Sequence, residues 1–280
     1  MPTFEHDGLR FHYLDRGEGR PFVFQHGLGG DVAEPFGLYS PPRGVRLLGM
    51  DCRAHGGTNP LGDIKKIALE PFADDLLTLL DFLDLPGAVV GGISMGAALA
   101  LNLALRHPER VHGLVLVRPA WLDRPLPANA RVFAHVAQLL LKYGASAGLE
   151  KFRGSADHAQ LTAESPETAR ALERQFLDPR AEECVVRLER IPHDCPAHDR
   201  REWASLSIPT LVLGSRHDPV HPWEFAEVLA QTLPCARLEE LTPTSVSLAR
   251  HAAELQASVD EFLMALGPIT PADHSGRIGS

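Results

Sequence analysis

Residues 89–98 read VVGGISMGAA and decide the fold of this chain. An apolar run typical of a buried strand ends at Ile93, and an apolar helix pattern begins directly after Ser94. Small residues on both sides of Ser94 let the strand and helix backbones approach at a sharp, strained turn. Such a turn lifts the serine hydroxyl clear of the backbone and sets it beside the positive N-terminus of the helix. The stretch therefore predicts that Ser94 is a nucleophile on a strand–turn–helix unit.

Glycine-rich phosphate-binding motifs do not explain this stretch. A dinucleotide fingerprint needs glycine at its first, third and sixth positions, and Gly91, Gly92 and Gly96 do not have that spacing. A P-loop Gly-Lys-Ser/Thr is also absent from the sequence. The remaining alternative to a nucleophile is a tight glycine turn with an incidental serine.

The rest of the chain alternates between strand and helix patterns. Helical periodicity is clearest at residues 72–83 and 248–266, where apolar residues recur at spacings of three and four. Apolar runs between the helices predict strands at 9–15, 21–25, 45–51, 88–93, 111–118, 210–214 and 237–242. This alternation predicts an α/β fold with a mainly parallel central sheet flanked by helices.

One long segment interrupts the alternation. Residues 121–206 contain helical patterns but no good strand. We expect helices near 129–142, 166–177 and 181–190, which together form a helical cap inserted between two apolar strands. The predicted organisation is an α/β core of residues 1–120 and 207–266, the cap at 121–206, and a mobile tail at 267–280.

Composition limits the partners and the compartment. A net charge of −9 over 280 residues gives no sign of the positive surface that would bind nucleic acid or an anionic membrane. The 4 cysteines are scattered without a Cys-x-x-Cys pair, and the 14 histidines show no His-Glu-x-x-His spacing. We expect a cytoplasmic protein without a metal or an organic cofactor, acting on a small molecule. Its oligomeric state is left open.

A second glycine-rich turn follows the strand predicted at 21–25. It reads QHGLGG at residues 25–30, and such a flexible turn can present backbone N–H groups to a developing oxyanion. The expected oxyanion donors are the backbone N–H groups of Leu28 and Met95. His26 is expected to support this loop through a structural hydrogen bond.

A third motif, MDCRAHGGT, lies at residues 50–58, between the glycine-rich turn at 25–30 and the serine turn at 89–98. With the two preceding motifs it resembles the α/β-hydrolase superfamily, which often carries an Asp-x-Arg-Gly-His-Gly-x-Ser-like turn at this point. Ala54 stands at the first glycine of that turn and Thr58 at its serine. The resemblance implies an α/β-hydrolase fold of the serine hydrolase or esterase type, with a helical cap.

The resemblance also implies a catalytic triad in the order serine, acid, histidine. The acid should follow a late apolar strand, and Asp218 comes just after the strand predicted at 210–214. Active-site residues gather at such strand ends in open α/β sheets. Arg118 also ends a strand, where it either binds a substrate carboxylate or forms an ion pair tying the cap to the core.

The histidine departs from the family pattern. A Gly-His pair usually follows the last strand, but residues 243–250 contain no histidine. Three histidines follow Asp218, namely His221, His251 and His274. His251 lies after the last strand in the first turns of the final helix, so it is the expected general base, with His221 as the alternative.

The sequence thus predicts a serine hydrolase that cleaves a carboxylic ester or related acyl bond through Ser94, Asp218 and His251, with an acyl-enzyme intermediate. Lactonase, carbon–carbon bond hydrolase and perhydrolase activities remain open on the same fold. A non-catalytic ligand-binding relative also remains open, because the Gly-His pair is missing.

Overall fold

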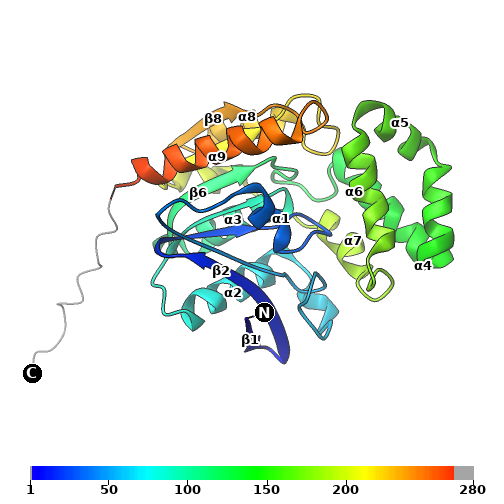
Figure 1. Cartoon of the computed structure of the whole chain (residues 1–280), viewed down its shortest axis with the longest axis horizontal. Helices are drawn as coiled ribbons and strands as arrows, with labels where there is room; N and C mark the ends of the chain where they lie inside the picture. The colour runs from blue at the N-terminus through cyan, green and yellow to red at the C-terminus, as the bar shows by residue number, and fades with distance from the viewer. Residues whose placement is uncertain (1, 268–280) are drawn as a thin grey trace, which may run out of the picture.

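A central sheet of eight strands organises the computed structural model, which describes residues 2–267 (Figure 1). Nearly all of the tail predicted at 267–280, including His274, lies outside the described residues. The strands are β1 (Thr3–His6), β2 (Leu9–Gly17), β3 (Gly19–Gln25), β4 (Gly44–Met50), β5 (Ala88–Ile93), β6 (Val111–Val117), β7 (Thr210–Gly214) and β8 (Ala236–Glu240).

The sheet order is β1-β2-β4-β3-β5-β6-β7-β8. β1 pairs with β2 and β2 with β4 in antiparallel fashion, whereas every pair from β4 to β8 is parallel. This confirms the predicted mainly parallel sheet. The short strand β1 was not predicted, because its four residues are too few to show a clear alternation.

Helices cover both faces of the sheet because successive strand residues point to opposite sides. On β5, Val90 joins the apolar core that includes side chains of α2 and α3, and Val89 joins the core on the face covered by α9. Of the flanking helices, α2, α3 and α8 contribute to the first core, and α1 and α9 pack on the other face. Their bounds are α1 (Ala33–Leu38), α2 (Leu69–Phe82), α3 (Met95–Arg106), α8 (Trp223–Thr232) and α9 (Leu248–Ala265).

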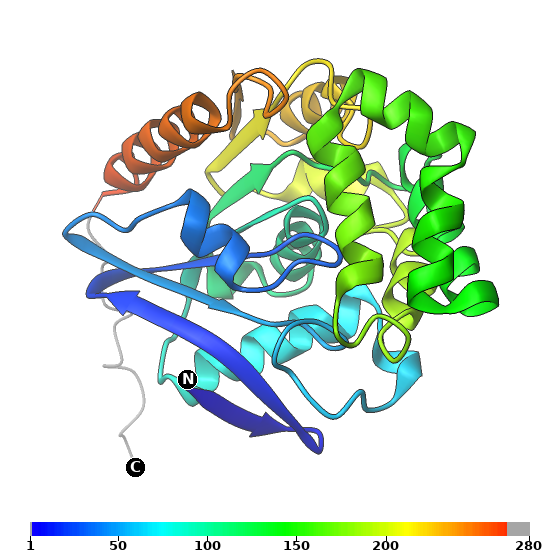
Figure 2. The ribbon, with the colours of Figure 1, turned by 45° about the vertical axis from the view of Figure 1, so that its right-hand side comes forward.

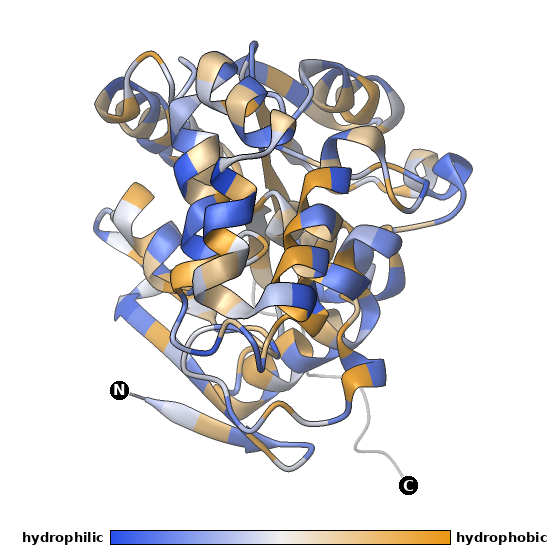
Figure 3. Ribbon diagram, turned by 90° about the vertical axis from the view of Figure 1, so that its right-hand side faces the viewer, coloured by the Kyte–Doolittle hydropathy of each residue, from blue (hydrophilic) through white to orange (hydrophobic). Residues whose placement is uncertain are grey.

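Between β6 and β7 the chain forms only helices and irregular segments, as predicted. We call this group the helical insert, made of α4 (Arg131–Arg153), α5 (Ala156–Glu164), α6 (Pro166–Leu177) and α7 (Val186–Arg190). Its helices gather at one end of the core (Figure 2), and each carries both hydrophilic and hydrophobic residues (Figure 3). The cap boundaries at 121 and 206 stay a prediction.

The predicted helices of the insert match the observed ones unevenly. The helix expected at 166–177 has the bounds of α6, whereas α4 continues beyond residue 142 through a kink at Gly144, where φ is 73°. The chain also contains short 3-10 helices at Ile64–Lys66, Pro108–Arg110, Ala128–Ala130, Ile191–His193 and Arg200–Ser205. Among the described residues, every helix is too short or too polar to cross a membrane.

The strand order reverses in the middle of the sheet, between β3 and β5. From β3 the chain continues to β4 on one side, and from β5 it continues to β6 on the other side. Ligands of open α/β sheets bind at the carboxyl ends of strands where the order reverses in this way. The loop after β3 and the turn after β5, which carry the sequence motifs, both lie at this point.

Candidate active site

Ser94 lies at the turn between β5 and α3 in a strained backbone conformation. Its φ is 57° and its ψ is −108°, a region that L-residues rarely adopt. Its carbonyl oxygen accepts the N–H groups of Ala97 and Ala98, so the helix begins at once. The serine is 6% exposed. Strain at a single polar residue on a cavity wall is typical of functional sites.

The small residues around Ser94 are required by close backbone packing. A Cβ added to Gly92 would lie 2.3 Å from the carbonyl carbon of Gly96. A Cβ added to Gly96 would lie 2.4 Å from the carbonyl oxygen of Gln25. The glycines therefore bring β5, α3 and the loop after β3 into direct contact, which is the physical reason for the motif.

The glycine loop after β3 lies against the serine turn. A Cβ on Gly27 would be 3.6 Å from Ser94 Cβ, and the Gly27 N–H donates to Glu34 Oε2 at 2.8 Å. Within residues 2–267, neither the Leu28 N–H nor the Met95 N–H donates to a protein acceptor. Both groups are thus free to donate to an added oxygen atom, as the sequence-based prediction requires.

His26 holds the loop as predicted. Its Nε2 accepts the Cys52 N–H at 3.1 Å, and its Nδ1 donates to the Gly27 carbonyl oxygen at 2.8 Å. The MDCRAHGGT turn also has a bracing role, since the Asp51 carboxylate accepts the N–H groups of Val32 and Gly57 at 2.7 Å each. These side chains orient the loops and do not line the cavity described next.

A cavity of about 480 Å³ opens in front of Ser94. Ser94, Leu28, His221 and His251 all line it, so the structure brings the predicted nucleophile together with both candidate bases. Apolar side chains form much of its wall, namely Leu28, Leu38, Ile93, Phe133, Leu172, Val220 and Leu248. Such a cavity has the size and lining of a site for a small molecule.

Asp218 lies in the loop after β7 and is held by five hydrogen bonds. Its Oδ1 accepts the N–H groups of Val220 and His221, each at 3.1 Å. Its Oδ2 accepts Arg118 Nε at 2.9 Å, Arg118 Nη2 at 2.6 Å and His221 Nδ1 at 3.0 Å. Burial alone would raise the pKa of the Asp218 carboxyl, but the charges of His221 and Arg118 outweigh burial and hold that pKa well below its usual range.

The expected hydrogen bond between Asp218 and His251 is not present in the described part of the chain. His251 lies in the first turn of α9, as predicted, but its Nδ1 donates to the Thr242 carbonyl oxygen at 2.8 Å. The carboxylate pairs with His221 instead, because His221 follows Asp218 by three positions in the same loop. No hydrogen bond joins Ser94 Oγ to either histidine within residues 2–267.

The expected role of Arg118 also needs correction. Its ion pair with Asp218 joins the ends of two neighbouring core strands, β6 and β7, and does not tie the helical insert to the core. Arg118 has a φ of 48°, so its backbone is strained like that of Ser94. The guanidinium lines the cavity and is 16% exposed.

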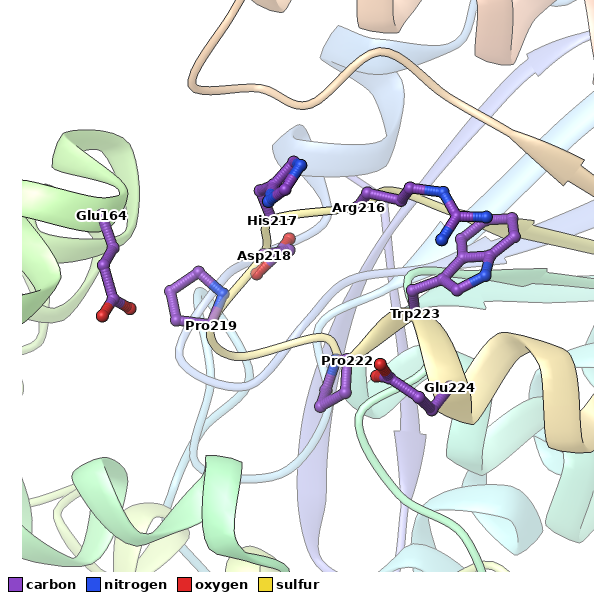
Figure 4. Close-up of a pocket in the computed structure, with 8 residues that line it drawn as sticks. All are labelled: Glu164, Arg216, His217, Asp218, Pro219, Pro222, Trp223 and Glu224. Atoms are coloured by element: carbon purple, nitrogen blue, oxygen red, sulfur yellow. The ribbon is translucent and has the colours of Figure 1, made fainter.

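A second cavity, of about 610 Å³, lies along the loop that carries Asp218 (Figure 4). In Figure 4, Glu164 at the end of α5 faces His217 and Pro219 across this space, and Arg216 lies beside Trp223. The Arg216 guanidinium is 4.5 Å from the centre of the Trp223 ring. This space separates the helical insert from the loop after β7.

Sequence reasoning missed Gln175, which reaches the glycine loop from the helical insert. Its Nε2 donates to the Gly29 carbonyl oxygen at 3.4 Å, and its Oε1 accepts Arg187 Nη2 at 3.4 Å. A contact between residues so far apart in the chain has no local sequence signal.

The chain is similar in sequence to proteins named as hydrolases. Over 246 residues the chain is 29% identical to the putative carbamate hydrolase RutD of Pseudomonas syringae, covering 81% of this chain and 87% of the relative. Over 242 residues it is 27% identical to 2-hydroxymuconate semialdehyde hydrolase of Pseudomonas putida, covering 82% of each.

Solved structures share the fold. The enol-lactonase from Burkholderia xenovorans superimposes with a TM-score of 0.72 at 24% identity, over 94% of this chain and 100% of the other. The sequence profile of the alpha/beta hydrolase fold matches residues 20–245, which is most of the chain. With its strained serine turn and mainly parallel sheet, the chain belongs to the α/β-hydrolase fold family.

Proposed function

We propose that the protein is a serine hydrolase that cleaves a carboxylic ester or a related acyl bond, with Ser94 as the nucleophile. The observation that carries this proposal is the strained Ser94 turn facing a cavity that two histidines also line. A serine hydroxyl is a weak nucleophile unless a base removes its proton, so a serine and a histidine in one cavity are the minimum equipment for acyl transfer.

The reaction follows from these groups. Ser94 Oγ attacks the carbonyl carbon while a cavity histidine takes its proton, and the N–H groups of Leu28 and Met95 stabilise the oxyanion. The protonated histidine then gives its proton to the leaving group, which departs as an alcohol. Water attacks the acyl-enzyme with the same histidine as base, which releases the carboxylic acid and restores Ser94.

The cavity supports a substrate of small to medium size. A volume of about 480 Å³ holds a small molecule, and the apolar wall suits the hydrocarbon part of an acyl group. Relatives are named for a carbamate and for 2-hydroxymuconate semialdehyde, so these two compounds belong in a substrate panel beside simple esters. The panel also includes the lactones and carbon–carbon substrates that the sequence leaves open.

Fluorophosphonate labelling, measured by intact-protein mass, tests the proposal. We expect one adduct on the wild type and none on Ser94→Ala, together with a loss of at least about 10⁴-fold in p-nitrophenyl acetate hydrolysis. Ser40→Ala is the matched control, since Ser40 is an exposed serine outside the cavity. A well-folded wild type that takes no adduct would favour the non-catalytic ligand-binding alternative.

A further inference from the structure

The two cavity histidines differ in the partner of Nδ1. His221 donates from Nδ1 to the Asp218 carboxylate, and His251 donates from Nδ1 to a backbone carbonyl. In each ring the proton on Nδ1 leaves the lone pair on Nε2, which is the tautomer that a general base needs. Both rings therefore have the tautomer that a general base needs, and they differ in the group that accepts the Nδ1 hydrogen bond.

A carboxylate is the better partner for a base. The imidazole becomes a cation when it takes the serine proton, and a hydrogen bond to a charged acceptor is about twice as strong as one to a neutral acceptor. The Asp218 carboxylate is 7% exposed, so water screens it little. Only His221 has such a partner, because His251 is held by the Thr242 carbonyl oxygen.

From these contacts we propose that His221, and not His251, is the general base for Ser94, and that Asp218 orients it. This inference rests on the proposed function. It moves the base to a position three residues after the acid in the same loop, and it accounts for the missing Gly-His pair after β8.

Arg118 is a positioning residue in this arrangement. Its two hydrogen bonds to Oδ2, with the two backbone N–H bonds to Oδ1, leave the carboxylate one orientation. The His221 ring follows that orientation through its bond to Oδ2 at 3.0 Å.

Burial favours the neutral form of His221. Burial lowers the pKa of His221, Asp218 and Glu34 oppose that shift, and Arg118 adds to it. His251, which lines the same cavity, also has a lowered pKa because of burial. A neutral ring with a free Nε2 is ready to accept the Ser94 proton.

A matched pair of variants tests the proposal, namely His221→Asn and His251→Asn. The asparagine amide can still donate to the old Nδ1 partner, but it carries no basic nitrogen. We expect the fluorophosphonate labelling rate to fall about 10³-fold in His221→Asn, since a general base contributes on the order of 10² to 10⁴. We expect less than about a tenfold fall in His251→Asn, because its amide keeps a donor for the neutral Thr242 carbonyl oxygen and the lost ring is not the base.

An equal or larger loss in His251→Asn would overturn the proposal while leaving Ser94 as the nucleophile. An unlabelled wild type would overturn both the proposed function and this inference. Imidazole added to His221→Ala supplies an independent measurement, because a free base entering the cavity should restore labelling there but not in Ser94→Ala.

Thermal unfolding shows whether each variant is folded. His221→Gln replaces His221→Asn if the shorter side chain destabilises the loop. If neither His221→Asn nor His221→Gln folds, the labelling rate of His251→Asn decides alone. Retained labelling in His251→Asn supports His221 as the base, and lost labelling rejects it.

Discussion

Different kinds of contact hold the nucleophile side and the acid–base side of the cavity in place. The nucleophile side, residues 88–98 at the end of β5, is fixed by contacts between backbones. The acid–base side, residues 214–251, is fixed by hydrogen bonds of side chains. His221 donates to the Asp218 carboxylate in the loop after β7, and His251 at the start of α9 donates to the Thr242 carbonyl oxygen. Steric contact allows few residue types, whereas a hydrogen bond to a carboxylate can be made from several positions.

The difference explains which side can vary. A substitution beside Ser94 must move two backbones, and packed interiors resist such shifts. A histidine can change its position in the chain if its ring still reaches the carboxylate and the serine. The nucleophile side therefore follows the family pattern, and the acid–base side is where this chain departs from it.

The largest effect is expected for Gly92→Ala on the nucleophile side. The added Cβ would lie 2.3 Å from the Gly96 carbonyl carbon, and neither backbone can yield without opening the turn. We expect a loss of about 3 kcal/mol or more in the free energy of unfolding, at the upper end for overpacking, with no fluorophosphonate labelling. Chemical denaturation and intact mass measure the two effects.

Gly37→Ala is the control for that variant. A Cβ on Gly37 meets nothing within 4 Å, and Gly37 lies in helix α1. Alanine there should stabilise the protein by about 0.4–1 kcal/mol and leave labelling unchanged. If Gly92→Ala were as well tolerated as Gly37→Ala, the steric account of the nucleophile side would be wrong.

The same contrast explains what could be predicted from the sequence. The strand–turn–helix unit at Ser94 and the parallel sheet were predicted correctly, because steric and burial constraints leave local patterns. The partner of Asp218 was predicted wrongly. It depends on where α9 begins relative to the loop after β7, which no local pattern records.

Arg118 and Gln175 show the same limit. Arg118 could be placed at a strand end from the sequence, but its pairing with Asp218 required the relative position of β6 and β7. Gln175 carried no local signal, because the residue that it contacts, Gly29, lies 146 positions earlier in the chain.

On the acid–base side, Arg118→Met should have the next largest effect. Removing Arg118 leaves the buried Asp218 carboxylate without its guanidinium partner, and breaking a buried pair in this way costs about 3 kcal/mol. The matched control is Arg46→Met, which breaks the half-exposed pair with Asp15 and should cost less than about 1 kcal/mol. Equal costs in the two variants would show that the Arg118–Asp218 pair contributes little to stability.

The cost of Arg118→Met should depend on pH in a defined direction. The folded-state pKa of Asp218 is depressed, so its stabilising contribution is present above the unfolded pKa of about 3.9 and is lost as pH falls through the folded value. Without Arg118 the folded pKa rises and this contribution shrinks. The difference between wild type and variant should therefore be full at pH 7 and smaller at pH 3, as measured by urea unfolding.

A smaller effect is expected on the pH dependence of labelling. The wild-type rate should rise with pH through a midpoint below the ordinary histidine pKa of about 6.5, since burial lowers the pKa of His221 and Arg118 lowers it further. Asp218 and Glu34 oppose that shift. Removing the Arg118 charge should move the midpoint to higher pH, and a midpoint that stays or falls would place the base away from the Arg118–Asp218 pair.

Gln175→Ala, which returns to the nucleophile side, should have the smallest effect. Gln175 supports the glycine loop from α6, but its bonds to Gly29 and Arg187 are both long, at 3.4 Å. Loss of one weak neutral hydrogen bond is worth about 0.5–1.5 kcal/mol, which corresponds to roughly a twofold to tenfold fall in rate. We expect the fall in kcat for p-nitrophenyl acetate with little change in KM, because the loop acts on the oxyanion of the transition state. Gln160→Ala, an exposed change on α5, should leave both constants unchanged. A change in KM alone would assign Gln175 to substrate binding and would separate the helical insert from the oxyanion loop.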